Sequence, residues 1–211
     1  MKSSYPILGF RKRVLKNFSA LIVIRGIGLI TPIVSLPYII RVVGIENYGL
    51  IAFSTIVSAF AGSIIQYGFS ISAVKYIAIR KNSLRKLTST FWHYFYASLL
   101  IALLVGLVHS LITISLPEFR EMWLIHSGAM LAAIGTAIFP HWLFLGVEKS
   151  FIVAISTLFV RISHLILILI FVRDPDDFVL VNFLGALAAW LNISVAVWLI
   201  VFRLDIRPIP V

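Results

Sequence analysis

The chain alternates long apolar runs with short polar segments. An apolar helix of about 20 residues crosses the roughly 30 Å core of a bilayer, and each run is long enough to do so. The runs do not alternate apolar and polar residues, as the strands of a membrane β-barrel would. The pattern therefore predicts six transmembrane helices, at residues 18–40, 48–79, 91–116, 123–145, 151–172 and 178–202.

Composition supports this interpretation, because 61% of the 211 residues are hydrophobic and only 12% are charged. The backbone polar groups of a membrane-spanning segment must form hydrogen bonds within the protein, which only helices and closed β-barrels achieve. Because the pattern excludes a barrel, the spans are predicted to be helices. We expect an all-α, polytopic membrane protein with a single six-helix lobe over residues 1–211. Residues 1–17 would precede the membrane region at 18–202, and residues 203–211 would form a tail.

The distribution of Lys and Arg predicts the orientation. With the N-terminus in the cytoplasm, the inside segments hold most of the 18 basic residues, whereas the outside turns hold only Arg41, Arg120 and Arg173. No Asp or Glu falls within a predicted span. Both termini are therefore expected in the cytoplasm, with the basic N-terminus and the first span acting as an uncleaved signal anchor.

The net charge of +10 does not indicate a nucleic-acid partner, because the basic residues follow the membrane topology. The chain has no cysteine, which excludes disulfides and thiol chemistry. It also lacks a phosphate-binding loop, a zinc-protease motif and a nucleophile elbow. We therefore expect no enzymatic activity, no catalytic residues, no metal site and no cofactor.

Arg25 lies roughly 10 Å inside the first span, on one helix face with Gly28, Pro32 and Ser35. A charge at this depth costs at least about 2.5 kcal/mol, so it usually faces protein or a watery cavity. The alternative is that its long side chain reaches the head groups. Pro32 and Pro37 each remove a backbone donor and weaken the helix nearby. We expect this segment to act as a hinge.

Arg161 falls near the middle of the fifth span, with His164 one turn further along the same face. The two side chains could contact an anionic group in a cavity, and His164 could also titrate. The alternative is a structural hydrogen bond to a neighbouring helix.

Two further spans carry polar stripes that include Gln66 and Asn182. Stripes of small and polar residues are typical of helix packing, and a ligand-binding role for these two amides is the alternative. The predicted spans hold cations but no carboxylate, so a cavity among them would suit an anion such as a phosphate.

Three stretches occur in the order found in a known family. LPYIIRVVGIENYGLIAF at 36–53 resembles the first outside turn of the Wzx-type polysaccharide flippases, in the superfamily of the MATE exporters and lipid II flippases. IIQYGFSISAVKYIAIRKN at 64–82 and IFPHWLFLGVEKSFIVAISTLFVRI at 138–162 resemble later segments of that family. Leu145 departs from the pattern, because the family often has Gln there. The matching residues include Pro37, Tyr38, Arg41, Gly44, Tyr48, Gly49, Gly68, Pro140, Trp142, Gly146, Glu148, Lys149 and Arg161.

The resemblance implies a carrier of undecaprenyl-pyrophosphate-linked oligosaccharide in the bacterial inner membrane, serving surface polysaccharide assembly. Arg25 and Arg161 would attract the pyrophosphate, and polysaccharide polymerases or other assembly proteins would be partners beside membrane lipids. Two alternatives remain, namely a MATE-like exporter of small molecules and a non-transporting scaffold for glycan-assembly enzymes.

Such flippases have two similar halves and about twelve spans, whereas this chain predicts six. Substrate sites of such transporters lie between two repeats, so a six-span half cannot enclose one alone. The chain is therefore expected to be a fragment, a truncated product or a half-transporter, and to need a second half or a homodimer partner.

Overall fold

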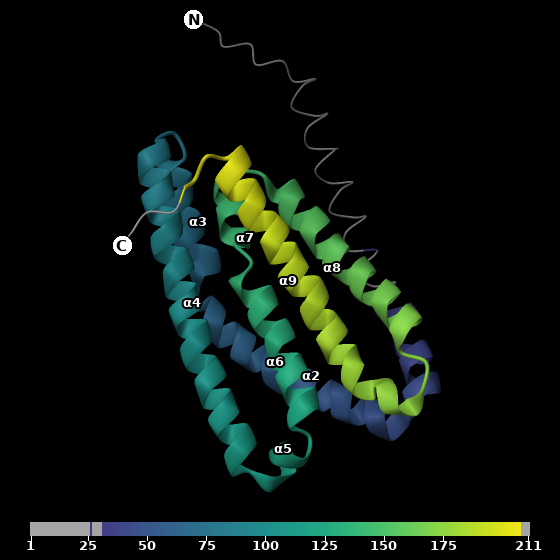
Figure 1. The fold of residues 1–211 in the computed structure, drawn as a ribbon. Coiled ribbons are helices and arrows are strands. Elements are labelled where there is room, and N and C mark those ends of the chain that lie inside the picture. Colours follow the sequence, from purple (N-terminus) through teal and green to yellow (C-terminus); the bar gives the residue numbers. More distant parts are fainter. Residues whose placement is uncertain (1–25, 27–30, 208–211) are drawn as a thin grey trace, which may run out of the picture.

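The computed structural model describes residue 26 and residues 31–207, and every regular element in this part of the chain is a helix. The first described helix is Thr31–Val43. It is followed by α2 (Ile45–Gln66), α3 (Phe69–Arg80), α4 (Leu84–Ser115), α5 (Pro117–Glu121), α6 (Trp123–Ile138), α7 (His141–Gly146), α8 (Ser150–Phe171), the 3₁₀ turn η1 (Pro175–Asp177) and α9 (Phe178–Arg203). Figure 1 shows these helices as a bundle with α6 and α9 in its middle.

Within the described residues, five helical stretches are long and apolar enough to cross a membrane. They correspond to the second to sixth predicted spans, and the all-α membrane fold is confirmed. The first predicted span lies mostly outside the described residues. α2 begins at Ile45, three residues before the predicted start, so Glu46 lies in its first turn rather than in a separate turn.

The helix Thr31–Val43 contains both Pro32 and Pro37 and continues without interruption to Val43. Both proline side chains are exposed. The helix ends at Val43 and is followed by Gly44, whose φ of 85° is a conformation that only glycine adopts readily. The turn into α2 therefore comes from Gly44 rather than from the prolines. The hinge at Pro32 and Pro37 stays a prediction.

The second predicted span is broken between α2 and α3. Tyr67 and Gly68 both adopt left-handed conformations, with φ of 36° and 71°. Glycine adopts this conformation without a steric penalty, whereas for Tyr67 it costs on the order of 1 kcal/mol. One apolar run in the sequence therefore forms two helices.

The fourth predicted span is also broken, between α6 and α7, but here the cause is a proline. Pro140 lacks an N–H and disfavours a helical conformation at Phe139, which is extended with ψ of 123°. The breaks are neighbours in space, because α2 packs against α6 and α3 packs against α7.

Close packing in the bundle depends on small residues, as expected where lipid removes the hydrophobic drive for helix association. A Cβ atom on Gly128 would lie 3.0 Å from the ring of Phe183, and one on Gly135 would lie 3.0 Å from the Cβ of Ala189. These glycines let α6 approach α9. A Cβ on Gly146 would lie 2.6 Å from the Cβ of Ile77, so α7 and α3 are in direct contact there.

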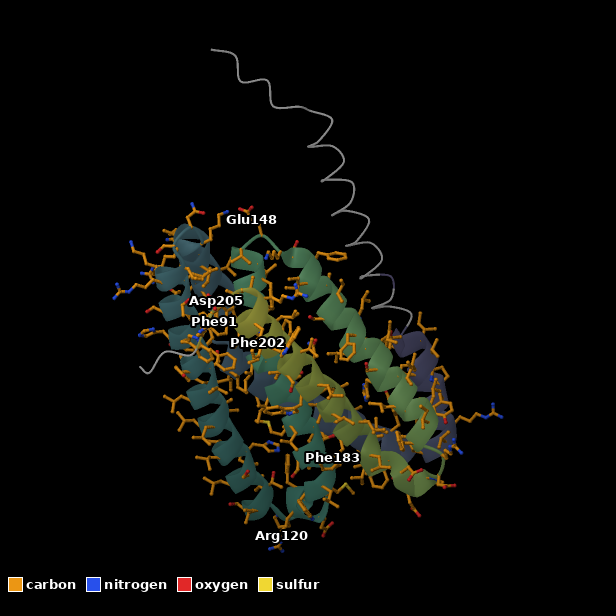
Figure 2. The ribbon with its side chains drawn as sticks, turned by 45° about the horizontal axis from the view of Figure 1, so that its top comes forward. Phe91, Arg120, Glu148, Phe183, Phe202 and Asp205 are labelled. Atoms are coloured by element: carbon orange, nitrogen blue, oxygen red, sulfur yellow. The ribbon has the colours of Figure 1, made fainter. Side chains whose placement is uncertain are left out.

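Arg120 and Glu148 mark opposite ends of the bundle in Figure 2. At the end of Arg120, the Tyr38 hydroxyl donates to the Val172 carbonyl (2.9 Å), which joins the first described helix to the end of α8. At the opposite end, Lys81 and Glu148 form an ion pair of 2.5 Å between the α3–α4 and α7–α8 connections.

The Lys81–Glu148 pair predicts a pH dependence of stability. The hydrogen bond from Lys81 and its positive charge lower the pKa of Glu148 below its ordinary value. A lowered carboxyl pKa stabilises the fold above the unfolded-state pKa, and this contribution is lost as the pH falls through the folded-state pKa. We expect Glu148→Gln to melt slightly below the parent chain at neutral pH, with the difference disappearing in acid. Melting curves across this range test it, and a difference that grows in acid would contradict it.

Candidate pocket between four helices

α2, α6, α8 and α9 surround a pocket of about 380 Å³. Most of its wall is alanine and glycine, contributed mainly by α2, α6 and α9. Its polar lining includes Gln66, His164 and Asn182, which come from α2, α8 and α9. The structure thus brings together three of the five side chains that the sequence proposed for a substrate cavity.

Asn182 is largely committed to holding helices together. Its amide nitrogen donates to the Ser54 hydroxyl (2.9 Å) and to the Ile125 carbonyl (3.2 Å). Its amide oxygen lies 3.3 Å from the Thr55 hydroxyl, whose single hydrogen is shared with the closer Ile51 carbonyl (2.7 Å). The side chain therefore joins α9 to α2 and α6, which favours the packing interpretation of this residue.

The two asparagines of α9 give a matched test of this role. Both are buried, but Asn192 makes no side-chain hydrogen bond among the described residues. Hydrogen bonds between membrane helices average about 0.6 kcal/mol, so we expect Asn182→Ala to cost about 1–2 kcal/mol and Asn192→Ala clearly less. Unfolding by dodecyl sulfate in mixed micelles measures both. Equal losses would contradict the assignment.

His164 is held by a backbone contact across two helices. Its Nε2 lies 2.9 Å from the Val181 carbonyl oxygen, which can only accept, so Nε2 carries the hydrogen. The ring lies against Gly185, where a Cβ atom would meet Nε2 and Cε1 at 3.3 Å. This is the structural hydrogen bond that the sequence offered as an alternative. Nδ1 has no hydrogen-bond partner among the described residues.

Gln66 is the polar candidate whose amide is uncommitted. It is the last residue of α2, directly before the break at Tyr67–Gly68, and it is partly buried. Its side chain makes no hydrogen bond within the described part of the chain. Its donor and acceptor groups are therefore available to a ligand.

Of the two arginines, only Arg161 falls within the described residues. Arg161 is exposed on α8 and does not line the pocket, although Val160 and His164 on either side of it do. It makes no ion pair or hydrogen bond with any described residue. Arg25 lies outside the described residues. A cavity role for either arginine stays a prediction.

Among residue 26 and residues 31–207, no cluster of three or more His, Asp or Glu could hold a metal ion. Among the described residues, the lining of the pocket contains no Asp, Glu, Lys or Arg. What the arrangement offers is a small-residue wall with a few hydroxyl, amide and imidazole groups, which suits a neutral polar ligand.

Comparison with known proteins identifies the family. The family described as "Polysaccharide biosynthesis protein" matches residues 14–209. The chain belongs to this family. Its assignment agrees with the resemblance seen in the three sequence stretches.

Two curated relatives resemble this chain over most of its length. A protein named "Putative O-antigen transporter" from Escherichia coli (strain K12) is 28% identical over 173 residues, covering 82% of this chain and 42% of the relative. A protein of the same name from Shigella dysenteriae is 27% identical over 190 residues, covering 88% of this chain and 46% of the relative. The chain thus spans less than half the length of these relatives. No solved structure matches it.

The α6 part of the small-residue wall was not anticipated from the sequence. It comprises Ala129, Ala132, Ala133 and Ala137. The sequence around them is almost entirely apolar, so hydropathy shows only a span. The density of alanine and glycine was the available signal, because small residues mark faces where helices approach closely.

Proposed function

We propose that the chain forms one lobe of a membrane transporter that moves undecaprenyl-pyrophosphate-linked oligosaccharide units across the bacterial inner membrane. The observation that carries this proposal is the alignment of most of the chain with two relatives named O-antigen transporters. Both relatives are more than twice as long as the aligned part. A second lobe would therefore complete the path, from further chain or from another copy.

The pocket supports a sugar-bearing ligand. Sugars are rich in hydroxyl groups, which pair with amides and hydroxyls such as those of Gln66, Thr55 and Ser63 in the lining. The described part of the lining carries no charged side chain, which agrees with a neutral oligosaccharide there. The pyrophosphate would need cations elsewhere, and Arg25 and Arg161 are the proposed partners.

We propose transport rather than catalysis, because both aligned relatives are named as transporters. In the proposed topology both termini lie in the cytoplasm. The end with Lys81, Arg85 and Lys86 then faces the cytoplasm, as the excess of positive charge favours. Polysaccharide polymerases and other assembly proteins are the proposed protein partners.

A chimera tests the function without requiring the chain to act alone. The aligned segment of the E. coli relative is replaced by this chain and expressed in a strain that lacks its O-antigen transporter. Restoration of the ladder of long lipopolysaccharide chains on a gel is the expected result. A chimera that reaches the membrane at the parental level yet leaves the ladder absent, with lipid-linked oligosaccharide accumulating, would contradict the proposal.

A further inference from the structure

A hollow of about 680 Å³ lies where α3 ends and α4 begins, separate from the pocket between α2, α6, α8 and α9. Three cationic residues line it: Arg80 from α3, and Arg85 and Lys86 from the first turns of α4. Ser83 and Ser89 add hydroxyl groups, and no acidic residue takes part. The lining thus concentrates donors and positive charge around one space.

The positive charge of this hollow is not neutralised by the described protein. Glu148 and Asp205 are the acidic residues placed towards this end, and each is already paired, Glu148 with Lys81 and Asp205 with Arg207. Arg85 and Lys86 make no ion pair or side-chain hydrogen bond with any described residue. Their charges are therefore available to an anion from outside.

Arg80 is held in position beside the hollow. Its guanidinium donates to the Thr90 hydroxyl (2.6 Å) and lies 5.3 Å from the centre of the Tyr76 ring. Thr90 in turn donates to the Lys86 carbonyl (2.7 Å). These contacts link α3 to the first turns of α4 and reduce the conformational freedom that Arg80 would lose on binding.

The start of α4 adds an electrostatic reason for an anion. Cations in the first turn oppose the helix dipole, and α4 has no acidic residue there and no side-chain cap from Ser83. Arg85 and Lys86 are therefore unfavourably placed in the isolated protein. A bound phosphate would compensate both the two charges and the helix end.

The level of the hollow in the bundle favours a lipid over a soluble anion. It lies where one candidate membrane span ends at Arg80 and the next begins at Leu84, which would place it near the head groups of a bilayer that these helices cross. Ile79 lines the hollow and is 69% exposed, and Leu84 beside it is 49% exposed. These side chains would contact acyl chains while the cations contact the phosphate.

We propose that this hollow binds the phosphate head group of an anionic phospholipid from the adjacent leaflet. The inference does not depend on the identity of the transported substrate. Arg80, Arg85 and Lys86 contact the phosphate, and the seryl hydroxyls contact the phosphate or the polar head. The bound lipid keeps the α3–α4 connection at the membrane surface.

The test uses the full 211-residue chain in a neutral detergent. The protein is titrated with dioleoyl phosphatidylglycerol or with dioleoyl phosphatidylcholine, and native mass spectrometry counts the bound lipids. Each cation near a charged lipid surface contributes about fivefold in affinity, so Arg85→Gln with Lys86→Gln is expected to weaken phosphatidylglycerol binding about tenfold or more. The matched control removes two exposed arginines at the opposite end, Arg41→Gln with Arg120→Gln. It should leave binding unchanged.

Three results would overturn the proposal: equal affinity for the two lipids, equal weakening in the control, or complete displacement of phosphatidylglycerol by millimolar inorganic phosphate. The last result would assign the hollow to a soluble phosphate. Melting temperatures of both double variants confirm that they are folded. Because the chimera assay reads polysaccharide transport and this assay reads lipid binding, the failure of either proposal is recognised separately.

Discussion

Replacing Gly146 by valine is expected to destabilise the protein by about 3 kcal/mol, because the site has no room for a side chain. A Cβ atom there would lie 2.6 Å from the Cβ of Ile77 and closer still to its Cγ2. It would also lie 3.1 Å from the Val74 carbonyl oxygen, which is backbone and cannot rotate away. α7 would have to separate from α3.

Unfolding in mixed micelles measures this loss, and Gly49 provides the control. Gly49 lies within α2, and a Cβ atom built on it meets nothing within 4 Å. Gly49→Val should therefore change the free energy of unfolding by only a few tenths of a kcal/mol, in line with helix propensity. A Gly146→Val protein as stable as Gly49→Val would show that α3 and α7 do not pack as described.

Filling the pocket between α2, α6, α8 and α9 is expected to abolish transport while sparing the fold. Ala59 lines the pocket from α2 and is exposed rather than packed in the core. Tryptophan at this position would occupy space that the proposed sugar needs. In the chimera, we expect Ala59→Trp to reduce the long lipopolysaccharide ladder about tenfold or more, equivalent to about 1.4 kcal/mol of lost productive binding.

Ala78→Trp is the matched control for this experiment. Ala78 is also an exposed alanine on a membrane helix, but it lies on α3 and does not line the pocket. It should leave the ladder intact at an equal level of protein. A normal ladder with Ala59→Trp, or an equal loss with Ala78→Trp, would contradict the proposal that the pocket lies on the transport path.

The positions of the described spans could be predicted because hydropathy reports directly which segments lipid can accept. The bounds of the third, fifth and sixth predicted spans agree with those of α4, α8 and α9 to within a few residues, except that α4 starts earlier. The fourth predicted span covers α6 and α7 together. The breaks within two spans could not be read from hydropathy, since both sides are apolar. Gly68 and Pro140 were visible signals, but a glycine or proline is also compatible with an unbroken membrane helix.

The candidate site was predicted only in part, for a geometric reason. Helical spacing shows which residues share a face, and it placed Asn182 and Gln66 on polar stripes. It does not show which face meets which neighbour, because that depends on how the helices cross. His164 therefore lines the pocket while Arg161, on the same predicted face of α8, does not.

The neighbouring breaks at Tyr67–Gly68 and Phe139–Pro140 interrupt the backbone hydrogen bonds of two packed spans. Helix backbones resist bending along their length, but a break in the hydrogen-bond ladder lets the two sides tilt. α3 and α7 pack together beyond the breaks, so a tilt of one against α2 or α6 would carry the other with it, and α4, which packs against α2, α3 and α6, would limit its size. Gln66 lies directly before the first break, so such a tilt would widen or narrow that end of the pocket. In the proposed transporter, this bundle would then admit or retain a ligand by a change within itself, besides any movement against a second lobe.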